Sequence, residues 1–159
     1  MPGPLLIDPL AVDTQHPLRD IEDIRRHNRQ RFEMEMLSGI ALIDFEKKLI
    51  AGYKHFSEEE FWVRGHIPGR PILPGVLQIE AAAQLTSYYF MEKIGNPQDV
   101  FIGFLGVTEV KFRGIVVPTD TLVIAAEERE MRSRRYTFYC QGFVREKMVF
   151  EGLVQGAPM

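Results

Sequence analysis

The sequence is poor in several features, and each shortage narrows the class of protein it can be. One cysteine among 159 residues cannot form a disulfide within the chain, which favours a reducing compartment. No apolar run approaches the roughly 18 residues of a membrane-spanning helix, and the first residues lack a basic segment followed by an apolar one. We therefore expect no spanning helix, no secretory signal and a cytoplasmic location.

Charge and motif content exclude further classes. The net charge is -3, so the chain lacks the broad basic field with which proteins bind nucleic acids. Its four histidines show no metal-ligand spacing, and a single cysteine cannot complete a zinc site. Neither a G-x-S-x-G elbow nor a glycine-rich phosphate loop is present. We expect no metal, no nucleic-acid partner and no serine nucleophile of the elbow type.

The length and the apolar content suit one domain with a real core, since 45% of the residues are hydrophobic. The first 17 residues contain four prolines and no sustained periodicity, which predicts an N-terminal arm over 1–17 and a single domain over 18–159. Immediately after the arm, Leu18, Ile21 and Ile24 recur at helical intervals among charges. This spacing predicts a short amphipathic helix that covers another element.

The remaining pattern predicts an α+β fold. The segment from Gly75 to Gly95 runs without internal glycine or proline and is apolar on almost every side, so it should form one long buried helix. Ahead of it, "RFEMEMLSGIALIDF" and "KLIAGYKHF" read as an antiparallel pair, the first opening with alternation of Phe32, Met34 and Met36 against two glutamates. Four more strand candidates follow: "VFIGFLGVTEVKF", "DTLVIAAEERE", "RRYTFYCQGFVRE" and "KMVFEGLVQG". We expect a curved antiparallel sheet of about six strands around the helix.

The stretch "GHIPGRPILPGVLQIEAAAQL" holds the candidate chemistry. Its three prolines and three glycines give a stiff loop that leads into the long helix. His66 begins this loop, and an imidazole is the side chain best suited to act as a base near neutral pH. Glu80 lies on the second helical turn, where burial would favour its protonated form and the helix dipole its ionised form. Either residue alone would read as structural, but together they indicate an acid–base pair.

Three neighbours complete the candidate site. Gly75 opens the helix, where a free backbone N–H could bind a developing oxyanion, and Val76 beside it is a candidate substrate contact. Gln84 follows Glu80 by four residues and can hold its carboxyl group or a water molecule. Gln78 either lines the path of the substrate or lies exposed near the helix start.

The sequence around these residues resembles the motif of a known family. "GHIPGRPILPGVLQIEAAAQ" resembles the active-site segment of the FabZ-type (3R)-hydroxyacyl-[acyl-carrier-protein] dehydratases of bacterial fatty acid synthesis, H-F-P-G-x-P-x-x-P-G-V-L-x-x-E-A-x-A-Q. "FLGVTEVKFRGIVVPTD" is similar to a second strand and turn of that family, and the likeness runs from roughly Asp20 to Gly152. It implies the hot-dog fold, in which one long helix lies inside a curved antiparallel sheet.

The resemblance also implies roles. It assigns the catalytic histidine to His66, the acid to Glu80 and the backbone donor to the thioester oxygen to Gly75. The implied reaction removes water from a hydroxyacyl chain carried on the phosphopantetheine of acyl carrier protein, with no metal or organic cofactor. Members of the family are dimers, often assembled as hexamers, in which the histidine of one subunit meets the acid of the other. The related FabA type, which also isomerises the double bond, has Asp in place of Glu80, so we expect no isomerase activity.

Two other functions stay open at this point. One is a hot-dog thioesterase, which would hold a thioester at the same helix start but activate water. The other is a non-catalytic module that binds acyl chains or carrier protein. Ile67 stands where the family has Phe, and this change and the polar Gln78 leave the acyl chain length undecided.

An acidic carrier protein needs a locally basic surface to dock on. Lys111 and Arg113 are the preferred candidates because they lie in the second segment that resembles the family. The run "MRSRRY", with Arg132, Arg134 and Arg135, is the other basic cluster, and an ordinary hairpin turn is the simpler explanation for it.

Overall fold

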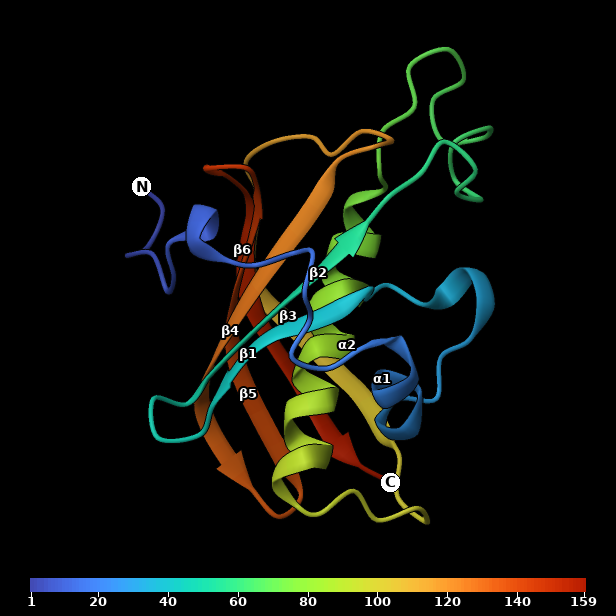
Figure 1. Cartoon of the computed structure of the whole chain (residues 1–159). Coiled ribbons are helices and arrows are strands. Elements are labelled where there is room, and N and C mark those ends of the chain that lie inside the picture. The colour runs from blue at the N-terminus through green and yellow to red at the C-terminus, as the bar shows by residue number, and fades with distance from the viewer.

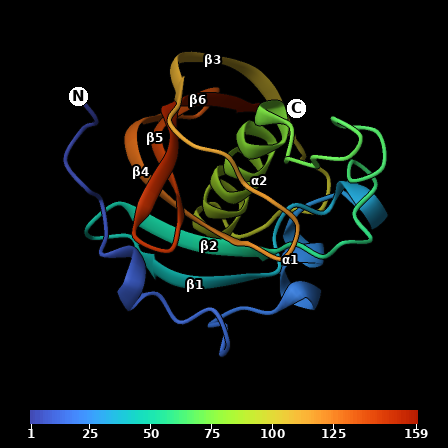
Figure 2. The ribbon, with the colours of Figure 1, turned by 90° about the horizontal axis from the view of Figure 1, so that it is seen from above.

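The computed structural model describes residues 1–159 and contains one long helix inside a curved six-stranded antiparallel sheet (Figures 1 and 2). The sheet order is β1-β2-β4-β5-β6-β3, which leaves β1 and β3 at the edges. The predicted α+β class is confirmed, and the arrangement is that of a hot-dog fold. The elements are α1 (Ile21–His27), β1 (Gly39–Asp44), β2 (Leu49–His55), α2 (Gly75–Lys93), β3 (Ile102–Phe112), β4 (Thr121–Arg132), β5 (Arg135–Val144) and β6 (Lys147–Pro158), with 3₁₀ turns at Pro9–Ala11 and Phe32–Met34.

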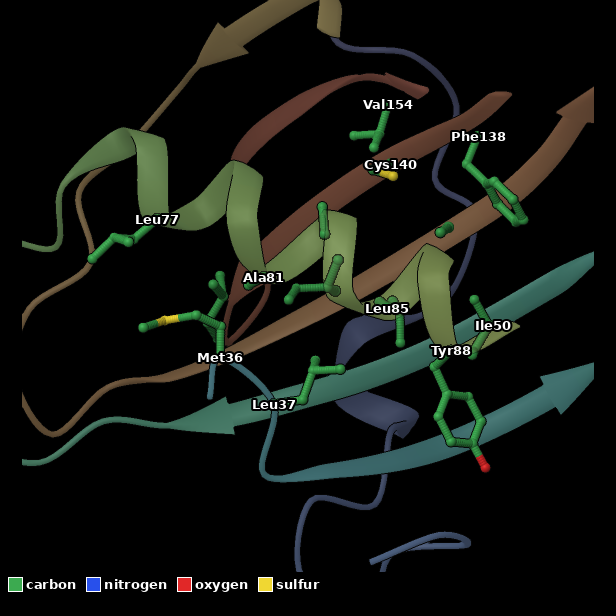
Figure 3. Close-up of a cluster of buried hydrophobic side chains, with 14 of the residues drawn as sticks. Met36, Leu37, Ile50, Leu77, Ala81, Leu85, Tyr88, Phe138, Cys140 and Val154 are labelled. Atoms are coloured by element: carbon green, nitrogen blue, oxygen red, sulfur yellow. The ribbon is translucent and has the colours of Figure 1, made fainter. Parts of the chain in front are cut away.

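Helix α2 forms where the sequence is free of helix breakers, and it ends beside Gly95, whose φ of +85° suits a glycine. Most of its side chains are buried against the concave face of the sheet, as predicted from its apolar surface. Figure 3 draws part of this core, in which Leu85 and Tyr88 of α2 lie near Ile50 of β2. Each large apolar side chain buried in this way contributes about 1.5–3 kcal/mol, so the helix is held firmly at the depth where its first turns carry the candidate site.

Helix α1 covers the C-terminal half of α2, in agreement with the expected covering role. Its first turn is capped by Asp20, whose side chain accepts a hydrogen bond from the Asp23 N–H. The Tyr88 hydroxyl of α2 donates to the Asp23 carboxylate at 2.5 Å, and Asn28 just after α1 donates to the Gln84 carbonyl at 2.9 Å. No helix of the structure is long and apolar enough to cross a membrane.

The prediction of a strand over Phe32–Met36 is wrong. Phe32–Met34 form a 3₁₀ turn in which Phe32 has a φ of 57°, and the first strand begins only at Gly39. The reason lies outside the segment. The Met36 N–H and the Met34 carbonyl bond to the side chain of Gln84 on α2, at 2.9 and 2.8 Å, so these backbone groups are not available to a neighbouring strand.

The N-terminal arm lies along the outer, convex face of the sheet (Figure 2). The side-chain amide of buried Gln141 holds it from both sides, since the amide oxygen accepts from the Leu6 N–H at 2.9 Å and the amide nitrogen donates to the Pro4 carbonyl at 2.8 Å. Further along, Ile7 and Val12 of the arm pack on a small outer cluster of Tyr53, Val123 and Phe143. The arm therefore covers the face of the sheet that α2 does not.

Candidate functional site

The loop between β2 and α2 extends beyond the sheet at the N-terminal end of α2 (Figure 1), and His66 lies on it. The His66 backbone N–H donates to the Trp62 carbonyl at 2.8 Å. The ring atom Nδ1 lies 2.7 Å from the Ile72 carbonyl oxygen. A carbonyl can only accept a hydrogen bond, so Nδ1 must carry the proton. The neutral ring consequently has its lone pair on Nε2, which is the state of a general base.

The backbone next to His66 is strained. Ile67 has a φ of 62°, in the left-handed region that a β-branched residue rarely occupies, and half of its side chain is exposed. Gly69 has a φ of 83° two residues later. Left-handed conformations of non-glycine residues persist only where the surroundings impose them, and they concentrate at functional sites. The loop thus holds the imidazole in one orientation at a cost in local stability.

Helix α2 begins at Gly75 with no side-chain cap. The Leu77 N–H donates to the Pro74 carbonyl at 2.9 Å, whereas no cap or loop hydrogen bond uses the N–H groups of Gly75 or Val76. Two donors with the positive end of the helix dipole behind them are therefore free to bind an oxyanion. The Val76 side chain is 69% exposed beside them.

Glu80 is held by Gln84, as the spacing predicts. The Gln84 side-chain nitrogen donates to the Glu80 carboxyl at 2.9 Å and to the Met34 carbonyl at 2.8 Å, and its oxygen accepts from the Met36 N–H at 2.9 Å. This buried amide thereby joins Glu80 to the loop that leads into β1. Glu80 itself is only partly buried. The apolar surface of the helix had suggested a more completely buried carboxyl group.

The structure brings Glu80 and Gln84 into hydrogen-bond contact, and it places Gly75 and Val76 side by side at the helix start. It shows no hydrogen bond between His66 and Glu80. The only side-chain hydrogen bond of His66 is the one to Ile72. Gln78 is only 2% exposed, and its side-chain oxygen has no partner, so the alternative of an exposed Gln78 is wrong.

The chemistry that this arrangement can carry out is proton transfer beside an oxyanion. It offers a base nitrogen, two free backbone donors and a carboxyl group held by an amide. No three histidine, cysteine, aspartate or glutamate side chains converge into a group that could hold a metal ion.

The two candidate docking residues differ in their surroundings. Lys111 on β3 is exposed, whereas Arg113 donates from Nε to the Glu151 carboxylate at 2.6 Å. Burial raises the pKa of the Glu151 carboxyl, but hydrogen bonds from Arg113 and Tyr139 outweigh burial and bring the pKa below its usual value. Arg113 is therefore committed to an ion pair, and Lys111 is the freer charge of the two.

The other basic cluster flanks the hairpin turn between β4 and β5, as the simpler interpretation predicted. Both Arg132 and Arg135 form ion pairs with Glu130 on the same hairpin. Their charges are thus partly compensated within the hairpin.

Sequence reasoning missed one residue of the site, Phe112 at the end of β3. A side chain at Gly75 would meet this ring, because an ideal Cβ there lies 2.9 Å from Phe112 Cζ. The sequence pattern places Phe112 at the end of a predicted strand and gives it no role in the site. Strand alternation could have shown that Phe112 points away from the face of its charged neighbours, but only the fold shows that it reaches the helix start.

Comparisons with known proteins agree with the geometry. A family model described as a FabA-like domain matches residues 28–152, a span that includes His66, Gly75 and Glu80. The chain is 33% identical over 146 residues to the 3-hydroxyacyl-[acyl-carrier-protein] dehydratase FabZ of Lawsonia intracellularis, a match that covers 89% of this chain and 94% of that one.

Two further similarities differ in kind. The bifunctional enzyme LpxC/FabZ of Chlorobaculum tepidum is 31% identical over 155 residues, which are 94% of this chain, but the chain spans only about a third of that protein. Among solved structures, the dehydratase heterocomplex ApeI:P from Xenorhabdus doucetiae superposes with a TM-score of 0.71 at 15% identity, covering 86% of this chain and 90% of that one. The latter likeness concerns the fold alone.

Proposed function

This chain belongs to the FabA-like domain family, and on that premise we propose that it dehydrates (3R)-3-hydroxyacyl-[acyl-carrier-protein] to trans-2-enoyl-[acyl-carrier-protein] in bacterial fatty acid biosynthesis. One observation carries the proposal. The Nδ1–H of His66 is committed to the Ile72 carbonyl at 2.7 Å, which leaves Nε2 as a base in a loop that leads to the free donors of the helix start. The dehydratase relative of similar length supports the same activity.

In the proposed mechanism, His66 Nε2 removes the proton from C2 of the acyl chain. The charge that develops on the thioester oxygen is stabilised by the Gly75 N–H and the helix dipole. Glu80, oriented by Gln84, supplies the proton to the 3-hydroxyl group as the C3–O bond breaks, so that water leaves and the C2–C3 double bond forms. Every step moves a proton between groups of the protein and the substrate, so the mechanism uses no metal or organic cofactor.

We assign this chemistry to a homo-oligomer in which the His66 of one copy works with the Glu80 of another. Two features support a second copy. His66 and Glu80 share no hydrogen bond within the chain. Strand β3 is an 11-residue sheet edge with a free side, and it exposes the large apolar residues Phe104 and Leu105. Long apolar edges are normally covered by another strand or chain. Whether dimers associate into hexamers is a further step of the same proposal.

The carrier of the substrate is proposed to be acyl carrier protein, docking near Lys111, with Arg113 as a weaker contributor because of its ion pair with Glu151. A cytoplasmic location accords with a single cysteine, Cys140, that is buried and unpaired. The glutamate at position 80 supports dehydration without isomerisation.

One experiment separates this function from its alternatives. Purified protein is incubated with 3-hydroxyacyl and with trans-2-enoyl carrier-protein thioesters, while the enoyl absorbance and the free thiol are followed together. A dehydratase interconverts the two thioesters and releases no thiol. Thiol release in proportion to turnover would identify a thioesterase, and binding without either signal would identify a non-catalytic module.

A further inference from the structure

The end of strand β3 approaches the start of helix α2 where Phe112 meets Gly75. The Phe112 ring contacts the Gly75 backbone so closely that a Cβ at position 75 would lie 2.9, 3.0 and 3.2 Å from three of its carbons. Gly75 does not have a positive φ, so its backbone conformation does not require glycine. The approach of the aromatic ring is what excludes a side chain at this position.

The ring approaches Gly75 from the side on which a Cβ atom would lie. In an α-helix the Cα–Cβ bonds tilt toward the N-terminus, which is also the direction of the N–H groups. A ring in the Cβ position of the first helical residue therefore lies beside the first turn on its N-terminal side, near the donors of Gly75 and Val76 that have no acceptor.

Residues of the neighbouring strand β6 hold Phe112 in place. It pairs in register with Phe150 of β6, which is buried in the core. The next two residues, Arg113 and Gly114, both donate to the Val149 carbonyl, at 2.7 and 3.2 Å. The ring is nevertheless 50% exposed, so it has one side on the helix start and another open to solvent or substrate.

We propose that Phe112 is a positioning residue of the dehydration reaction, whose ring forms the apolar wall of the oxyanion site and keeps water from the Gly75 N–H. This inference rests on the proposed function and adds a part to it. A hydrogen bond to a developing oxyanion is stronger where water is excluded, because the local dielectric constant is lower. Phe112 would thus act on the transition state more than on substrate binding, although its ring touches no reacting atom.

The kinetic test compares four variants. Phe112→Ala should lower kcat about tenfold with KM within about twofold of the parent, since the lost stabilisation is confined to the transition state. Phe112→Tyr keeps the ring and should retain the parent kcat. Phe101→Ala, just before the same strand and 47% exposed, is the matched control and should also retain it. Gly75→Ala should resemble Phe112→Ala, because its methyl group displaces the ring.

The double variant decides the cause. If both single changes remove the same contact, Gly75→Ala with Phe112→Ala should be no slower than the slower single variant, instead of about a hundredfold below the parent as independent effects would give. Multiplicative losses would mean that Gly75 is needed for the approach of substrate, and they would overturn the proposal. A rise in KM at unchanged kcat would overturn it as well.

A second measurement needs no substrate. Deuterium uptake by the peptide that contains Gly75 and Val76 should rise in Phe112→Ala and stay at the parent level in Phe112→Tyr and Phe101→Ala. Equal uptake in all variants would show that the ring does not shield these amides. If the parent protein fails to interconvert the two thioesters, the proposed function is wrong, and the uptake experiment still decides whether Phe112 shields the helix start.

Discussion

Replacement of Gln84 by methionine tests how the loop before β1 and the acid of the site depend on one side chain. Methionine has a similar length and no strong hydrogen-bonding group, so the volume of the buried site is kept. Three hydrogen bonds disappear: those to the Met34 carbonyl, from the Met36 N–H and to the Glu80 carboxyl. Met34 is exposed, so its carbonyl can bond to water, whereas Met36 is fully buried and its N–H is left without an acceptor.

The size of the effect follows from that one donor. An orphaned buried N–H costs about 1–3 kcal/mol, and we take about 2 kcal/mol for the variant. For a chain of this size each kcal/mol lowers Tm by about 2–4 °C, so the expected fall in Tm is about 4–8 °C. Turnover should fall by about tenfold or more, because a displacement of roughly 1 Å in a catalytic group is costly.

Thermal unfolding and steady-state turnover of 3-hydroxyacyl thioesters measure the two effects. Thr86→Val is the matched control on the same helix, since it removes a buried hydroxyl that donates to the Ala83 carbonyl at 3.0 Å and does not contact Glu80. It also leaves the buried Tyr136 hydroxyl, 3.3 Å from the Thr86 hydroxyl, without that partner, so it should lose about 1–3 kcal/mol of stability and keep its turnover. If Gln84→Met turns over as fast as Thr86→Val, then Gln84 does not orient Glu80. An unchanged Tm would refute the expected loss of stability from the unpaired Met36 N–H.

Four further variants have expected outcomes. His66→Ala should abolish dehydration while the protein keeps its oligomeric state. Glu80→Gln should lower the rate by about 10²-fold, which is a usual contribution of acid–base catalysis. A rate within a few fold of the parent would assign the substituted residue a structural role. Lys111→Glu should lower kcat/KM for carrier-protein substrates, less so at high salt, and leave coenzyme A substrates unchanged; equal losses on both substrates would move the docking surface elsewhere. Because the folded-state pKa of Glu151 is lowered, its ion pair with Arg113 contributes stability above its ordinary pKa of 4.5 and loses it as the pH falls through the lowered value. Glu151→Gln should therefore be less stable than the parent at neutral pH and approach it in acid, and a stability difference independent of pH would contradict this assignment.

The sequence was sufficient for features that depend on local pattern. The long helix could be predicted because the stretch between Gly75 and Gly95 contains no glycine or proline and is apolar on most sides, and it appears as Gly75–Lys93. The strands after it lie between clear turn signals, and all four are present. The pairing of Gln84 with Glu80 follows from a spacing of four residues on one helix.

Features set by distant residues could not be predicted. The alternation of Phe32, Met34 and Met36 is a valid strand pattern, but Gln84, 48 residues beyond Met36, takes the backbone groups that a strand would use. Phe112 reaches Gly75 only because the sheet curves around the helix. No pattern within either segment contains that information, since register and curvature arise from the whole sheet.

Both groups of the proposed acid–base pair are held in fixed orientations within the chain. His66 is fixed by the Ile72 carbonyl and by a strained backbone at Ile67, and Glu80 is fixed by Gln84, so neither group is free to swing toward the other. The proposed homo-oligomer would let the His66 of one copy and the Glu80 of another act on one substrate. The free edge of β3 is the place where a second copy would bind. A protein kept monomeric by a charged substitution at Leu105 on that edge should therefore remain folded and lose dehydration, and full turnover by such a monomer would show that one chain holds the whole site.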